Sequence, residues 1–108
     1  MVRTKKRITV PLNPPLVLAV EKFLREKYGK VRGNVSALVS RAVRETLDEV
    51  DKLLEMDLPP LMGKVDVCVT IDRDLYNRLN FLSKLYGVPR SELVRRCLAL
   101  FFKRYGVM

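Results

Sequence analysis

The feature that most constrains the fold is an internal repeat. Residues 7–47 and residues 66–102 carry the same order of apolar and turn residues. Three blocks match in sequence: RITVPLNPPL with DVCVTIDRDL, EKYG with KLYG, and NVSALVSRAV with PRSELVRRCL, displaced by 59, 58 and 55 positions. The displacement shrinks because the first copy has a longer loop, GKVRG. A repeat whose largest length change lies in a turn indicates a supersecondary unit that occurs twice.

Each copy begins with a stretch in which apolar and polar residues alternate. Ile8, Val10 and Leu12 are the apolar positions of the first stretch, and VDVCVTID repeats the pattern. Period-two alternation predicts a half-buried β-strand. A lone strand leaves its backbone unpaired, and a two-stranded ribbon needs helices on one face. We therefore expect the two strands to pair antiparallel; the alternative is that each copy pairs with the same copy of a second chain.

Two helices are predicted after each strand. Asn13 and Asp72 are the expected N-caps, with side-chain oxygens accepting helical N–H groups, and Pro14 suits the first helical position. Gly29 and Gly87 are expected to end the first helix of each copy. The expected apolar faces are Leu16, Val20, Phe23 and Leu24; Leu75, Leu79, Leu82 and Tyr86; Leu38, Val39, Ala42, Val43, Leu47, Val50 and Leu54; and Leu93, Val94, Cys97, Leu98 and Phe101.

The last helix is expected to end near Tyr105-Gly106. Leu100 and Phe102 fall outside its apolar face, so we expect them to pack on the connector or between neighbouring molecules. Residues 57–63, DLPPLMG, form that connector, since two prolines disfavour a helix.

The composition favours a polyanionic partner. The net charge is +9, with 21 Lys or Arg against 12 Asp or Glu. Small chains of such charge often bind nucleic acid, although a merely basic surface is the plainer interpretation. Six of the twelve acidic residues lie between Glu45 and Asp57, in the far part of a helix, where we expect them to point away from a polyanion.

Several kinds of chemistry have little support in the sequence. There is no His, the two cysteines lack a C-x-x-C spacing, and no nucleophile–base pair or phosphate-cradling glycine loop is evident. We therefore expect no enzyme activity, no cofactor, no metal and no small-molecule ligand. The apolar runs are too short to span a membrane and no signal peptide is evident, so we expect a cytoplasmic, nucleoid-associated protein.

Three stretches resemble a known family. KKRITVPLN and KVDVCVTID resemble the strands, and GVPRSELVRRCLALFF the second helix, of the ribbon-helix-helix DNA-binding proteins, the group of Arc, MetJ and CopG-like repressors. The resemblance implies a mainly α fold with a two-stranded antiparallel β-ribbon that enters the DNA major groove. Two copies in one chain would form an intramolecular pseudo-dimer, with motifs at residues 1–56 and 64–108, the connector 57–63 between them, and one shared core.

The resemblance also implies which residues contact double-stranded DNA. The candidate base readers are Lys5, Arg7, Thr9, Lys64, Cys68 and Thr70, and Pro11 and Asp66 share their outward side. The candidate phosphate contacts are Arg3, Lys6, Lys30, Arg32, Asn34, Ser36, Arg90 and Ser91. Arginine can bond guanine O6 and N7 together, threonine suits several bases, and a helix N-terminus favours phosphate.

Plainer roles stay open for these residues. Arg7 and Thr9 would equally suit a solvated strand face, and the RTKKR arm would suit a disordered tail. Arg90 and Ser91 would suit a helix start without a ligand, and Cys68 is as suited to a neutral surface thiol as to a base contact.

The expected function is sequence-specific DNA binding by a transcriptional repressor, with possible association of further copies of the chain. The alternatives are an antitoxin-type interaction module and a general DNA-coating protein. Asp66 stands where a basic residue is usual in the family, and Pro11 cannot donate to the ribbon. Since Arg7 aligns with Asp66 and Thr9 with Cys68, a ribbon made of both strands predicts an asymmetric DNA site.

Overall fold

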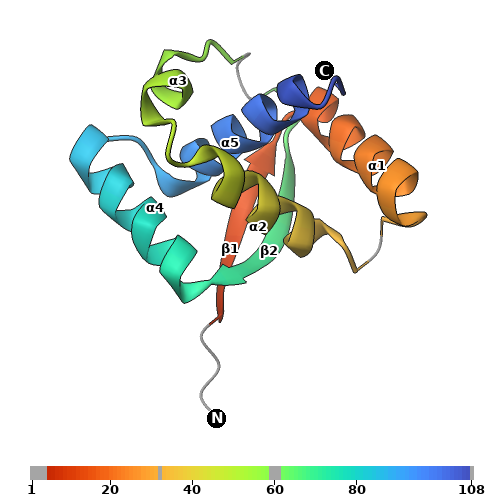
Figure 1. The fold of residues 1–108 in the computed structure, drawn as a ribbon, viewed down its shortest axis with the longest axis horizontal. Coiled ribbons are helices and arrows are strands. Elements are labelled where there is room, and N and C mark those ends of the chain that lie inside the picture. Colours follow the sequence, from red (N-terminus) through yellow and green to blue (C-terminus); the bar gives the residue numbers. More distant parts are fainter. Residues whose placement is uncertain (1–4, 32, 59–61, 108) are drawn as a thin grey trace.

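The computed structural model describes residues 5–31, 33–58 and 62–107. The elements are β1 (Lys5–Leu12), α1 (Pro14–Tyr28), α2 (Val35–Thr46), α3 (Val50–Glu55), β2 (Val65–Asp72), α4 (Arg73–Tyr86) and α5 (Arg90–Arg104). In Figure 1, α2 and α5 cross in front of the two strands, while α1 and α4 lie at opposite ends of the molecule. The fold is therefore mainly helical, with one two-stranded antiparallel sheet, as expected.

The two strands pair within the chain. Their register runs from Lys5 opposite Asp72 to Leu12 opposite Val65. The backbone N–H of Thr70 donates to Ser36 Oγ at 3.0 Å, so it does not donate to β1. Because hydrogen-bonded and non-hydrogen-bonded pairs alternate in an antiparallel ladder, every second pair from Arg7–Thr70 has its N–H groups at the outer edges. Pro11, opposite Asp66, occupies such a pair, so its missing N–H weakens nothing in the ribbon.

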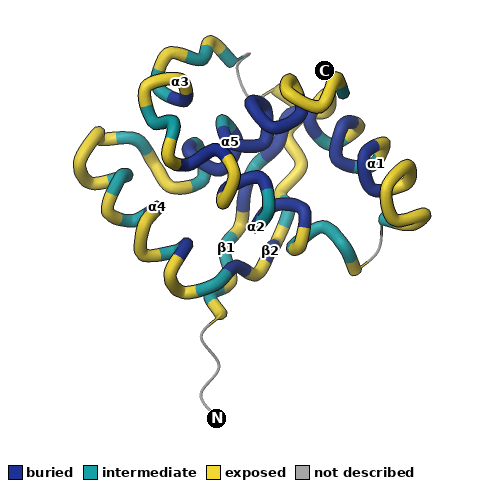
Figure 2. The backbone as a smooth tube through the Cα atoms, viewed as in Figure 1, coloured by how far each residue is buried: buried dark blue, intermediate teal, exposed yellow. Residues whose placement is uncertain are grey.

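The core lies between the inner face of the ribbon and the helices (Figure 2). Its largest buried side chains come from both halves of the chain: Leu12, Leu16, Phe23, Leu24, Leu38, Leu47, Leu53, Ile71, Leu79, Leu93, Phe101 and Phe102. The Phe23 ring centroid lies 5.4 Å from that of Phe101 and 5.9 Å from that of Phe102, in edge and tilted geometries that aromatic pairs prefer. The two halves are therefore joined through one continuous apolar core.

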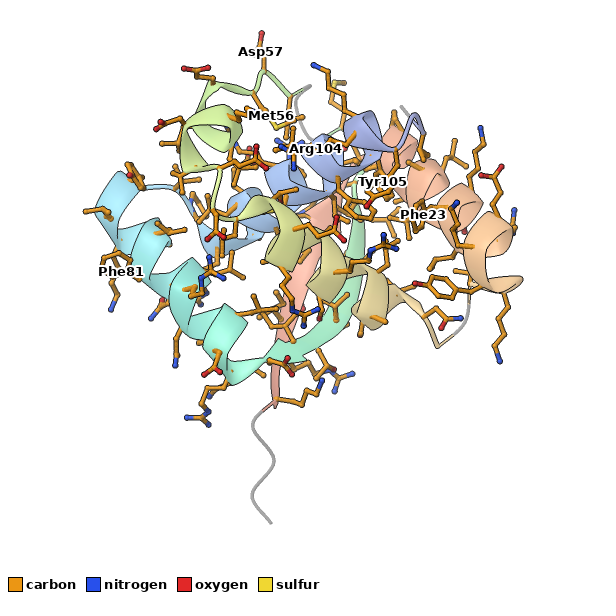
Figure 3. All side chains as sticks on the ribbon, viewed as in Figure 1. Phe23, Met56, Asp57, Phe81, Arg104 and Tyr105 are labelled. Carbon is orange, nitrogen blue, oxygen red and sulfur yellow. The ribbon has the colours of Figure 1, made fainter. Side chains whose placement is uncertain are left out.

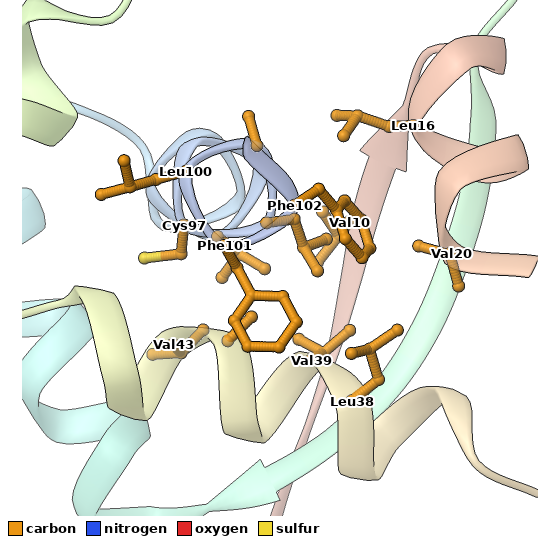
Figure 4. Close-up of a cluster of buried hydrophobic side chains, with 14 of the residues drawn as sticks. Val10, Leu16, Val20, Leu38, Val39, Val43, Cys97, Leu100, Phe101 and Phe102 are labelled. Atoms are coloured by element: carbon orange, nitrogen blue, oxygen red, sulfur yellow. The ribbon is translucent and has the colours of Figure 1, made fainter. Parts of the chain in front are cut away.

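The prediction for Phe102 was wrong, because α5 is buried on nearly every side. Phe102 has no exposed surface, and Leu100 is 9% exposed. Figure 4 shows α5 end-on, with Leu100 and Phe101 pointing in different directions from it. Residues 97–102 of α5 are all buried, so this part of the helix is enclosed on every side rather than along one stripe. Leu100 lines a cleft with Met56 and with Leu58 of the connector.

The second helix of the first copy, predicted as continuous, is interrupted. It ends at Thr46, and α3 follows as a separate short helix in which Leu53, rather than Leu54, is fully buried. The Thr46 hydroxyl donates to the Ala42 carbonyl at 2.7 Å. Such a bond to the preceding turn often bends a helix. Beyond the break, Arg96 Nη1 donates to the Leu53, Leu54 and Met56 carbonyls at 2.7, 3.2 and 3.1 Å and so holds the end of α3.

The two predicted N-cap residues occupy the N-cap positions, but their side chains do not make the predicted capping hydrogen bonds. Asn13 and Asp72 precede α1 and α4, but neither side chain bonds a helical N–H. The Asn13 backbone carbonyl accepts from the Leu16 amide at 3.0 Å instead. Among the described residues Asn13 Oδ1 is buried without a partner, and the Asp72 carboxylate binds cations.

The predicted helix ends were confirmed, whereas one residue predicted for the apolar face of α4 is not part of the core. Gly29 and Gly87 end α1 and α4 as predicted, with φ of 77° and 69°, a conformation that favours glycine. The last helix ends at Arg104, with Tyr105 as its C-cap, as expected. Tyr86, however, is 44% exposed and does not belong to the core face of α4. Cys97 is buried as expected, and this burial raises the pKa of its thiol to about 12.

No helix among the described residues is long and apolar enough to cross a membrane. Residues 59–61 of the connector lie outside the described residues.

Candidate nucleic-acid interface

The ribbon has one face that the helices do not cover. We call it the outer face; it carries the side chains of Lys5, Arg7, Thr9, Pro11, Asp66, Cys68 and Thr70. All of these residues are exposed except Pro11, which is half-buried. The strands place them there because alternate side chains point to opposite sides, and the apolar set is held by the core. The candidate base readers of both strands, Lys64 excepted, thus share one exposed face.

The centre of the outer face is the pair Thr9–Cys68. The Thr9 hydroxyl and the Cys68 thiol share a hydrogen bond, with Oγ1 and Sγ 3.7 Å apart. This bond, followed by the nearby guanidinium of Arg7, lowers the pKa of the Cys68 thiol. Cys68 therefore makes a polar contact with Thr9 across the ribbon and is also exposed.

The two ends of the outer face differ in charge. At one end, the Lys5 ammonium lies 3.0 Å from the Asp72 carboxylate and Arg44 lies 3.5 Å from it. The pKa of the Asp72 carboxyl is lowered, chiefly by the hydrogen bond from Lys5. At the other end, Lys64 Nζ lies 4.0 Å from the Asp66 carboxylate. Arg7 makes no ion pair with a described carboxylate, so its charge is available to a ligand.

A cavity of about 520 Å³ opens beside β1, where α5 begins. Its lining is Arg7, Ile8, Thr9, Tyr76, Ser83, Pro89, Arg90 and Ser91. The Arg90 guanidinium lies 5.0 Å from the Tyr76 ring centroid, and its Nη1 donates to Asn80 Oδ1 at 2.6 Å. Lys6 Nζ lies 5.6 Å from the same ring. The cavity thus combines a helix N-terminus with oriented cations, which favours an anion.

A second cavity of about 530 Å³ opens beside β2, where α2 begins. Its lining is Lys5, Gly33, Ser36, Ala37, Ser40, Arg44, Thr70 and Asp72. Asn34 Nδ2 donates to the Lys30 carbonyl at 3.2 Å, so this side chain orders the loop before α2. Ser36 Oγ accepts from the Thr70 amide, and its hydroxyl hydrogen stays free to donate. Each edge of the ribbon is therefore flanked by a cavity at a helix N-terminus.

The structure brings most of the predicted site residues together. Arg90 and Ser91 flank one edge of the ribbon and Ser36 flanks the other. Lys30 is exposed in the loop after α1, outside both cavities. Arg3 and Arg32 lie outside the described residues.

Sequence reasoning missed Arg44 and Tyr76. Arg44 follows Ser36 and Ser40 at successive four-residue steps, which places all three on one side of α2. That spacing was a usable signal. Tyr76 had none, because an aromatic residue in a helix is ordinarily core, and only the fold brings Lys6 and Arg90 to its ring.

Comparison with known proteins gives one match. Residues 63–106 match the family model of a ribbon-helix-helix domain, and this span contains β2, α4 and α5, in the order strand, helix, helix. The match covers the second copy of the repeat and does not extend into the first. No curated protein and no solved structure matches the chain. Ribbon-helix-helix domains generally bind DNA and regulate transcription. Residues 63–106 are therefore similar to a ribbon-helix-helix domain, and in this structure their strand β2 pairs with β1 of the same chain.

Proposed function

We propose that the protein is a cytoplasmic, nucleoid-associated transcriptional regulator, a repressor, that binds double-stranded DNA sequence-specifically through its β-ribbon. The observation that carries the proposal is the outer face itself. It exposes Arg7, Thr9 and Thr70 on one ribbon whose two edges are flanked by helix N-termini. A two-stranded ribbon fits the major groove, where side chains can reach base edges.

We also propose that the chain is a tandem pseudo-dimer. Residues 1–56 and 64–108 would be two ribbon-helix-helix motifs with a shared core, joined by the connector 57–63. The support is the antiparallel pairing of β1 with β2 and the glycine with positive φ that ends the first helix in each half. On this arrangement one chain supplies the ribbon that otherwise needs two.

In the proposed complex the two kinds of contact have different tasks. Arg7 donates to guanine O6 and N7, and the hydroxyls of Thr9 and Thr70 bond neighbouring bases. The amides at the starts of α2 and α5, with Ser36, Arg90 and Ser91, hold the flanking phosphates and fix the register. Arg3, Lys6, Lys30 and Arg32 add attraction that does not depend on sequence.

The test is selection of bound duplexes from a random pool, followed by titration of the selected site and of random DNA with wild type and Arg7→Ala. Loss of a base reader should cost about 1–3 kcal/mol on the selected site and much less on random DNA. Lys103→Ala is the matched control, because it removes the same charge from the last turn of α5, about 20 Å along that helix from its start.

Two results would contradict the proposal. Equal losses on both DNAs would make Arg7 a phosphate contact. Uniform loss of protection from a footprint as salt rises would indicate a coating protein without a defined site.

A further inference from the structure

The register of the ribbon and the sequence repeat together locate the centre of the outer face. Cys68 is the register partner of Thr9 and is also the residue aligned with Thr9 in the repeat. An axis that exchanged the two copies would therefore pass through the pair Thr9–Cys68. The next outward pairs on either side are Arg7–Thr70 and Pro11–Asp66. The axis would exchange these two pairs, so their difference measures how far the ribbon departs from symmetry.

The two pairs are chemically opposite. Arg7 and Thr70 supply hydrogen-bond donors, and the Asp72 carboxylate at their end is paired with Lys5 and Arg44. At the other end, Pro11 has no donor and the Asp66 carboxylate only accepts, with the Lys64 ammonium 4.0 Å from it. Each pair takes one residue from each strand. The chemical difference is therefore between the two ends of the ribbon, and not between its two strands.

We infer that the ribbon reads a non-palindromic DNA site whose two halves have different base chemistry. This inference rests on the DNA-binding function proposed above. The half-site under Arg7 and Thr70 presents acceptors, with guanine O6 and N7 under Arg7. The half-site under Asp66 presents an exocyclic amino group, as on cytosine, whose N4 a carboxylate can accept from.

The spacing of the two halves follows from strand geometry. Arg7 and Pro11 are four residues apart on β1, which corresponds to about 13 Å along the strand. That length spans about four base-pair steps of B-DNA. The guanine and the amino-bearing base should therefore lie about four steps apart, on either side of the base pair below Thr9 and Cys68.

Asp66 contributes to specificity mainly by exclusion. A carboxylate in the groove is repelled by phosphate and is desolvated, so a base edge with only acceptors beneath it disfavours binding. Arg7 contributes mainly by attraction. Because the two ends cannot exchange roles, the protein should bind each site in a single orientation.

Selection of bound duplexes by the full chain tests this, with wild type compared with Asp66→Ala and Asp66→Arg. Wild type should enrich a non-palindromic consensus. Asp66→Ala should relax base preference in one half only, lowering discrimination there about five- to a hundredfold while strengthening binding to random DNA. Asp66→Arg should shift that same half toward the sequence preferred under Arg7. Position 66 is exposed, so circular dichroism should show each variant folded.

The possible failures are distinguishable. A palindromic wild-type consensus would overturn the inference and leave DNA binding intact. A consensus whose two halves both relax in Asp66→Ala would overturn it as well. Absence of any enriched sequence would overturn the proposed function, and the inference with it.

Discussion

The two halves of the molecule share a sequence pattern but are packed differently, and α1 and α4 show this most clearly. α1 buries Leu16, Ala19, Val20, Phe23 and Leu24, whereas α4 buries only Leu75 and Leu79. Figure 3 shows Phe81 pointing into solvent from α4, and this ring is 65% exposed. Phe23 instead lies against Tyr105, with ring centroids 6.1 Å apart. The same helical periodicity therefore places one helix in the core and leaves the other at its margin.

The two ends of α5 explain why α1 and α4 are packed differently. Its C-terminal turns carry Phe101 and Phe102, which pack on α1 through Phe23. Its N-terminal turn, next to α4, begins with Arg90, whose guanidinium packs on Tyr76 and bonds Asn80. The end of α5 near α1 thus contributes apolar contact, and the end near α4 contributes the polar lining of a candidate anion site. The difference teaches that one helix can be apolar in its packing at one end and polar at the other.

The largest expected effect is on the free energy of unfolding, and it distinguishes α1 from α4. Phe23→Ala should reduce the free energy of unfolding by about 3–5 kcal/mol, because it leaves a cavity beside the buried rings of Phe101 and Phe102. Phe81→Ala should change it by less than about 0.5 kcal/mol, since most of that ring is in solvent. Urea denaturation followed by circular dichroism measures both. Similar losses in the two variants would show that α4 is as firmly packed as α1.

The sequence was sufficient to predict the elements that local periodicity determines. The strands, the apolar faces of α1 and α2, and the glycine ends of α1 and α4 all follow from spacing and from the positive φ that glycine adopts readily. The outer face was predictable for the same reason, because alternation along a strand determines which side chains leave the core.

What the sequence could not predict depends on tertiary contacts. The burial of Phe102 follows from α5 being enclosed by other elements, which its own periodicity does not report. The break after Thr46 follows from one side-chain hydrogen bond together with the contact of Arg96 at the end of α3. Asp72 looked like a cap, but the fold places it beside Lys5 and Arg44.

A smaller effect distinguishes the two helix starts that flank the ribbon. Ser36 and Ser91 align in the repeat, but Ser36 accepts from the Thr70 amide, and the residue aligned with Thr70 is Pro11, which has no N–H. Ser36→Ala should therefore lower the free energy of unfolding by about 1 kcal/mol, whereas Ser91→Ala should leave it within about 0.5 kcal/mol. Ser91→Ala should weaken DNA binding instead.

Chemical denaturation of the two serine variants, paired with titration of the selected DNA site, measures both effects. If Ser36→Ala and Ser91→Ala destabilised the protein equally, the hydrogen bond from the Thr70 amide to Ser36 would add no stability beyond what Ser91 contributes at the aligned position.

The smallest expected effect concerns the acidic segment of the first half, where it meets the second. Arg104 on α5 donates to Glu49, and Lys52 Nζ lies 3.0 Å from it. These two contacts, that of Arg104 foremost, lower the pKa of Glu49 to about 2. The pKa of Glu in an unfolded chain is about 4.3. Because the folded pKa is the lower one, the stabilisation is fully present above the unfolded pKa and is lost as the pH falls toward 2.

The free energy of unfolding should consequently fall between pH 5 and pH 2, and the fall should be shallower in Glu49→Gln than in wild type. Glu26→Gln is the matched control, since Glu26 is exposed and makes no ion pair with a described residue. Urea denaturation at several pH values measures the slopes. If Glu49→Gln and Glu26→Gln both kept the wild-type slope, the contact of Glu49 with Arg104 would be too solvated to contribute measurably to the joining of the two halves.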